Sequence, residues 1–166
     1  SNDTRMLVAG MMGGLRRDQY EDKKTEKKKE EYNKDYGSLV GSFDALDRLA
    51  GQANKVLNHP GLGGVTGLRG KIPDVPGSDA ANARAELEAL QAQVGFAVLQ
   101  NMRNNSRTGG ALGNVSDAEG KRLEAALGAI KSSQSEDQLR ANLKKIADYA
   151  STSKDNLTKV FKVKHG

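Results

Sequence analysis

The sequence predicts an all-α fold, an elongated helical protein, and three observations support this. Apolar residues recur at helical spacing in several segments. Those segments are bounded by Gly, Pro or Ser-x-x-Glu/Gln patterns, which start and stop helices. Aromatic residues make up only 4% of the chain, so the core is expected to consist of narrow seams between helices. We divide the chain into an N-terminal extended helix or linker, residues 1–35, and a helical structural domain, residues 36–166.

The N-terminal segment has two parts. Residues 6–15 read MLVAGMMGGL, which is too short and too rich in glycine to span a membrane. Residues 16–36 are almost entirely charged, and Glu30 stands four residues before Lys34 in a favourable helical pair. High helix propensity without an apolar face indicates a charged helix bridging solvent or a partly disordered linker.

A narrower apolar seam follows and predicts a helix over residues 36–58. Its apolar residues alternate steps of four and three. They are Leu39, Phe43, Leu46, Ala50, Ala53 and Leu57. His59-Pro60 ends the helix, because a residue before proline is pushed out of the helical region.

Residues 60–77, PGLGGVTGLRGKIPDVPG, predict a long ordered loop or an extended arm rich in Gly and Pro. The glycines do not fit the dinucleotide fingerprint, because Thr66 stands where its last glycine is needed. Pro76-Gly77 then forms a turn, and Ser78 or Asp79 caps the next helix.

The central and longest helix is predicted from this cap to about Asn104. It is also the most apolar helix, and it should lie at the centre of the core. Its seam consists of Ala83, Leu87, Leu90, Val94, Ala97 and Met102.

Residues 108–123, TGGALGNVSDAEGKRL, resemble a phosphate-binding loop at first sight. Aligned on Gly120-Lys121, however, a P-loop would need glycine at Val115 and a hydroxyl at Arg122. A capping box of Ser116 and Glu119 explains the stretch better, as a helix start after a tight turn.

A second capping box follows at Ser135 and Gln138. The two helices that these boxes open are joined by a short connection. They are predicted to form a C-terminal αα-hairpin.

The block NMRNNSRTGGALGNVSDAEGKRLEAALGAIKSSQSEDQLRANLKKI, residues 101–146, resembles a module of tailed-bacteriophage and prophage virion proteins, and residues 60–103 are similar to it as well. In that family the loop often reads Ser-Pro-Thr-Gly-Gly-Ala-Leu-Gly, so Arg107 departs from it by replacing proline. The resemblance covers about two thirds of the chain and leaves out residues 1–57. It implies a structural, tail-associated or DNA-ejection component and carries no catalytic residue.

The residues suited to catalysis or metal binding are few. The chain has no Cys and two His, and neither His59 nor His165 has an obvious Asp or Ser partner nearby in the sequence. Carboxylates lie on polar helix faces beside Lys or Arg, so a glycosidase pair is not indicated. We predict a protein that is not an enzyme, with no cofactor, no metal and no small-molecule substrate.

The net charge of +5 lies mostly at the C-terminus. Residues 154–166 hold Lys154, Lys159, Lys162 and Lys164 against Asp155, a net of +3. Such a tail can contact phosphate or anionic lipid. It lacks the interleaved aromatic residues that stack on bases.

Three hypotheses follow for the function. The favoured one is a bacteriophage structural protein, made in the host bacterial cytoplasm and located in the virion. It would oligomerise around the portal or tail channel, or act as an internal DNA-ejection protein, with copies of itself and portal, tail or other virion proteins as partners. The alternatives are contact with viral DNA through the Lys-rich tail, or with the host membrane through residues 6–15. The residues expected at the interface between copies are Val65, Leu68, Leu39, Phe43 and Leu46.

Overall fold

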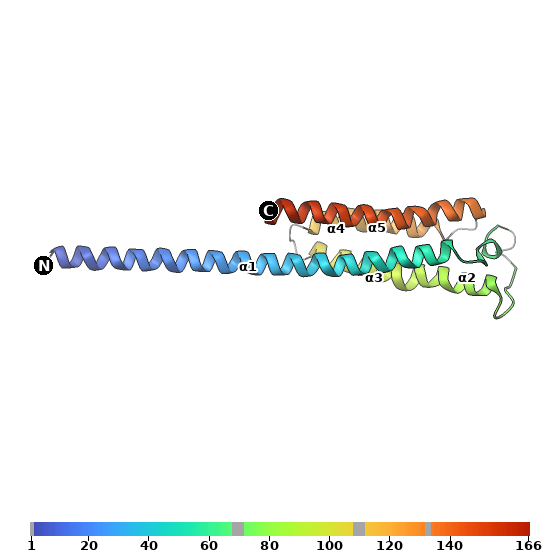
Figure 1. Cartoon of the computed structure of the whole chain (residues 1–166), viewed down its shortest axis with the longest axis horizontal. Helices are drawn as coiled ribbons and strands as arrows, with labels where there is room; N and C mark the ends of the chain where they lie inside the picture. The colour runs from blue at the N-terminus through green and yellow to red at the C-terminus, as the bar shows by residue number, and fades with distance from the viewer. Residues whose placement is uncertain (1, 68–71, 108–111, 132–133) are drawn as a thin grey trace. The chain divides into compact units, whose positions relative to one another are not determined.

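The structure, a computed structural model, describes residues 2–67, 72–107, 112–131 and 134–166 (Figure 1). These residues contain helices and no strand, which confirms the all-α class. In chain order the elements are α1 (Asn2–Leu57), η1 (Leu62–Val65), α2 (Asp79–Glu88), η3 (Ala89–Val94), α3 (Gly95–Arg107), α4 (Gly113–Ala129) and α5 (Glu136–His165).

The contacts divide the chain into two units, Ser1–Tyr36 and Gly37–Gly166. The first unit is helical, and every side chain of residues 16–34 is exposed. The rings of Tyr32 and Tyr36 stack with their centroids 6.1 Å apart. No helix among the described residues is long and apolar enough to cross a bilayer.

The second unit is a bundle in which consecutive long helices run in alternating directions (Figure 1). α1 ends at one end of this bundle, where α2 and α5 begin. α3 ends and α4 begins at the opposite end. The continuous run of α2, η3 and α3, residues 79–107, corresponds to the predicted central helix. It was wrongly predicted to be the longest one, because α1 has 56 residues and α5 has 30.

The ends of several helices follow the local sequence rules. α1 ends at Leu57, two residues before His59-Pro60, as predicted. The His59 Nδ1 then accepts a hydrogen bond of 3.1 Å from the Gly61 N–H, which fixes the turn. Ser78 caps α2 by accepting from the Ala81 N–H, and Ser135 caps α5 by accepting from the Gln138 N–H. Of the two candidates for the first cap the structure uses Ser78, and at α5 it confirms the serine half of the predicted capping box.

The buried core occupies the second unit and includes residues from α1, α3, α4 and α5 and from the segments between them. Its larger members, all less than 2% exposed, are Leu46, Leu49, Val56, Leu62, Leu90, Val98, Met102, Leu123, Leu139, Leu143, Ile146 and Leu157. Polar contacts also tie α1 to its neighbours. The Ser42 hydroxyl donates to Asn101 on α3, and Lys154 on α5 pairs with Asp47 at 2.7 Å.

The seam predicted for the α1 part of this bundle is only partly right. Leu46 and Ala53 are fully buried as expected, but Leu49 and Val56 are buried as well. Phe43, Ala50 and Leu57 are only partly buried against the core. The buried stripe is therefore rotated by about one position relative to the predicted one.

Residues 60–66 differ from the predicted extended arm, because they pack on the chain's own α2. Leu62 is fully buried, and the Thr66 hydroxyl donates to the Gly63 carbonyl at 3.0 Å. A Cβ on Gly61 would lie 1.9 Å from the Asp79 carbonyl oxygen, and one on Gly64 would lie 2.6 Å from the Ala80 Cβ. These two glycines let the backbone of η1 approach the start of α2 closely.

A π-helical turn, η3, interrupts the helix between α2 and α3. The Gly95 N–H donates to the Leu90 carbonyl, five residues back. A Cβ on Gly95 would lie 2.7 Å from Leu127 Cδ1 and 2.8 Å from the Leu90 oxygen. The absence of a side chain therefore allows α3 and α4 to approach closely at this point.

Candidate functional site

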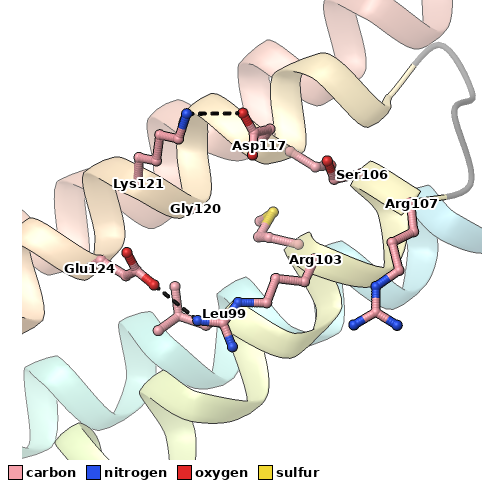
Figure 2. A pocket seen from close by; sticks show the side chains of 10 residues that line it. Leu99, Arg103, Ser106, Arg107, Asp117, Gly120, Lys121 and Glu124 are labelled. Carbon is pink, nitrogen blue, oxygen red and sulfur yellow. Dashed lines mark hydrogen bonds and ion pairs between the residues drawn. The ribbon is translucent and has the colours of Figure 1, made fainter.

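A cleft between α3 and α4 is the best candidate for a binding site (Figure 2). Its volume is about 300 Å³. We call it the α3–α4 cleft. It is lined from α3 by Leu99, Met102, Arg103, Ser106 and Arg107, and from α4 by Ser116, Asp117, Gly120, Lys121 and Glu124.

Charged side chains surround the apolar part of this cleft. Arg103 of α3 reaches across to Glu124 of α4, with Nη2 and Oε1 2.9 Å apart. Lys121 pairs with Asp117 one turn earlier on α4, at 3.3 Å (Figure 2). All four of these side chains are at least half exposed, so each pair contributes little to stability. They are therefore available to exchange partners with a ligand.

Arg107 differs from the other cations of the cleft. It stands in the last turn of α3 and is exposed. Among the residues that the structure describes, no carboxylate forms an ion pair with it, and Figure 2 draws its guanidinium without one. The lining thus holds three cations against two carboxylates, which gives the cleft one positive charge in excess.

Ser116 lies in the wall of the cleft, and its capping role was predicted wrongly. α4 begins three residues earlier, at Gly113, and the Ser116 N–H donates to the Leu112 carbonyl as in any helix interior. The Ser116 side chain is fully buried, and among the described residues its hydroxyl has no hydrogen-bond partner. A buried hydroxyl without a partner destabilises the fold.

We therefore expect Ser116→Ala to raise the free energy of unfolding by about 1 kcal/mol, because alanine favours the helix and removes the unpaired hydroxyl. Ser135→Ala is the matched control, since it removes a hydroxyl that does cap a helix. It should lower the free energy of unfolding by about 1 kcal/mol. Denaturant titration of both variants measures the difference. Equal losses in the two variants would show that Ser116 also acts as a cap.

Glu119, the other half of the predicted capping box, is used between helices. It is 3% exposed, and its carboxylate accepts hydrogen bonds of 2.8 Å from Ser153 and from Asn156 on α5. The Tyr149 hydroxyl donates to the Glu119 backbone carbonyl at 2.8 Å. Burial raises the pKa of Tyr149 to about 12, so this hydroxyl stays protonated and donates across the neutral range. The cluster joins α4 to α5.

The two histidines have structural contacts. His59 accepts from the backbone in the turn after α1, and the ring of His165 lies 4.8 Å from that of Phe161, centroid to centroid. Among the described residues, no group of three or more His, Cys, Asp or Glu side chains is arranged to hold a metal ion.

The lysines predicted to contact phosphate or lipid fall into two groups. Lys154 is tied to Asp47, and its ammonium lies 5.1 Å from the centroid of the Phe43 ring. Lys159, Lys162 and Lys164 are exposed on the last turns of α5. The second group could still present positive charge to a partner.

The residues predicted at an interface between copies lie mostly against the chain's own core. Leu46 is fully buried, which leaves it no surface for a partner. Leu39, Phe43 and Val65 are partly buried and pack against the core. Leu68 lies outside the described residues. Contact of Val65 with another chain stays a prediction.

None of the cleft residues was predicted as a binding site, although the spacing of its charged residues indicates two charged helix faces. Arg103 and Arg107 stand four residues apart, and Asp117, Lys121 and Glu124 follow steps of four and three. Each set therefore occupies one helix face. What the sequence could not show is that the two faces oppose each other.

Comparison of the chain with known protein families, with curated proteins and with solved structures finds no match. The function has to be inferred from the chain's own residues.

Proposed function

We propose that the chain is a non-enzymatic structural component of a bacteriophage particle. It assembles with copies of itself, around the portal or tail channel or as an internal DNA-ejection protein. The resemblance of residues 60–146 to virion proteins supports a place in a bacteriophage particle. The exposed surface of the second unit supports assembly with other copies.

The observation that carries the proposal is a pair of exposed aliphatic side chains on an ordered segment. Ile72 is 63% exposed and Val75 is 70% exposed, three residues apart. A single exposed apolar residue is ordinary, but neighbouring ones on a fixed segment indicate a contact surface.

The charged helix of residues 16–34 adds a second reason. All of its described side chains are exposed, so its own chain buries none of its surface in this stretch. A helix of this kind gains stability only from propensity and from pairs along its surface. Binding to other virion proteins would supply the burial that the helix lacks.

Sedimentation velocity of the full chain over a hundredfold range of concentration tests the assembly. We expect the sedimentation coefficient to rise with concentration, because association follows mass action. A folded protein that stays monomeric throughout would contradict self-assembly.

The exposed lysines at the end of α5 support a second candidate, contact with DNA. Filter binding of duplex DNA over a series of salt concentrations separates the two functions. Retention that falls steeply as salt rises would favour phosphate contact. Replacing Lys159, Lys162 and Lys164 by Gln should then abolish retention while leaving self-association unchanged.

A further inference from the structure

The segment 72–77, which we call the apolar loop, carries the two exposed aliphatic side chains, and two contacts hold its backbone against α2. Asp74, between them, forms an ion pair with Arg84 on α2, with Oδ2 and Nε 2.5 Å apart. The Ser78 N–H closes a turn by donating to the Val75 carbonyl, and Gly77 adopts a φ of +79° in that turn. Because the loop is already ordered, little further entropy is lost when it binds a partner.

The α3–α4 cleft offers a place of suitable size and polarity for such side chains. Its volume of about 300 Å³ is about twice the roughly 150 Å³ that holds a benzene-sized group in an apolar cavity. Leu99 and Met102 supply apolar wall, and Met can change shape to fit an incoming group. Gly120 leaves room where any other residue would project a side chain.

The charges of the two surfaces are complementary. Of the two carboxylates of residues 72–79, Asp74 is already paired with Arg84, whereas the exposed Asp79 forms no ion pair among the described residues. The cleft has three cations against two carboxylates, and Arg107 has no ion pair among the described residues. The Asp79 carboxylate, directly after the apolar loop, is therefore attracted to Arg107 at the rim of the cleft.

The two surfaces also stand at different places on the second unit. The apolar loop directly precedes α2, at the end of the bundle where α1 finishes. The Arg107 and Asp117 part of the cleft lies toward the opposite end, where α3 ends and α4 begins (Figure 1). A protruding patch and a complementary pocket at separate places make a head-to-tail contact, which closes into a ring or continues as a filament.

We propose that the apolar loop of one copy inserts Ile72 and Val75 into the α3–α4 cleft of the next copy. This rests on the proposed self-assembly and names the two surfaces that carry it. The contact is heterologous, so each copy offers one loop and one cleft.

Two variants remove one side of the contact each. Ile72→Ser with Val75→Ser alters only exposed side chains. Gly120→Leu fills the cleft, and its new Cβ would lie 3.5 Å from the Met102 Cβ, an ordinary contact distance. Val163→Ser is the matched control, because it removes another exposed aliphatic side chain, 88% exposed, at the end of α5. Circular dichroism checks that all of them fold.

In sedimentation velocity, each variant alone should associate at least about a hundredfold more weakly than the unchanged chain, because each aliphatic side chain buried is worth at least about tenfold. The control should associate normally. A one-to-one mixture of the loop variant and the cleft variant should form a dimer and nothing larger. In that dimer the intact loop of one chain occupies the intact cleft of the other.

The outcomes separate this inference from the function it rests on. If the unchanged chain does not associate at all, both the self-assembly and the contact are wrong. If the chain associates and either variant still associates as strongly, the contact is wrong and the assembly uses another surface. A mixture of folded variants that stays monomeric would also overturn it.

Discussion

Replacing Leu90 by Asp is expected to leave the second unit unfolded. Leu90 is fully buried in the π-helical turn η3, and its carbonyl accepts the Gly95 N–H. Leu90 belongs to the hydrophobic core, so a carboxylate placed there would lie among apolar side chains, and an unpaired buried charge costs several kcal/mol. That is comparable to the roughly 5–15 kcal/mol that stabilises a typical domain.

The measurement is the thermal transition of the full chain followed by circular dichroism. The Leu90→Asp variant should lose its cooperative transition, whatever helicity residues 2–36 retain. Gln93→Asp is the matched control, since Gln93 is exposed on the same turn. It should keep the transition within a few degrees. A Leu90→Asp protein that still melted cooperatively would mean that the carboxylate reaches solvent.

Val94 is predicted to show a smaller effect on the same helix. It is only partly buried against the core, so an aspartate there could turn its carboxylate toward water. Comparing the stability of the Leu90→Asp and Val94→Asp variants therefore tests which face of this helix is turned toward the core, and not merely that the helix forms.

The helices themselves could be predicted from the sequence because their signals are local. Ser78 and Ser135 each accept from the N–H three residues on, and His59-Pro60 ends α1 by a steric rule. These features depend only on residues within one turn. They do not depend on how the helices pack against one another.

The buried stripe of α1 could not be predicted to the residue. Leu46 and Ala53 belong both to the predicted seam and to the observed one, in which Leu49 and Val56 are also buried. At 3.6 residues per turn, either stripe is compatible with the sequence. The choice depends on how α1 meets the other helices, which no local pattern encodes.

The start of α4 shows a different kind of limit. A serine followed three residues later by glutamate is the pattern of a capping box, yet Glu119 is bound by Ser153 and Asn156. The competing partners stand more than thirty residues away on α5. The same separation explains why the α3–α4 cleft was missed, since it exists only where two helix faces meet.

Replacing Gly61 by Ala is expected to destabilise the second unit by about 3 kcal/mol, the upper range for an overpacked site. The backbone conformation is no obstacle, because φ of Gly61 is −87°, which alanine adopts readily. The obstacle is space, since the added Cβ would lie 1.9 Å from the Asp79 carbonyl oxygen and 2.2 Å from its carbon. Backbone atoms cannot turn aside as a flexible side chain can. η1 must therefore move away from α2, which would also expose the buried Leu62.

Gly51→Ala is the matched control for this substitution, and it should act in the opposite direction. Gly51 is an exposed residue inside α1, and its added Cβ would meet no atom within 4 Å. Alanine there should stabilise the helix by about 1 kcal/mol. The thermal midpoint should thus fall for Gly61→Ala and rise for Gly51→Ala, as measured by circular dichroism. Midpoints that rise together would mean that residues 60–66 stand away from α2 as the extended arm first predicted from their glycines, because only then would Gly61 have room for a methyl group.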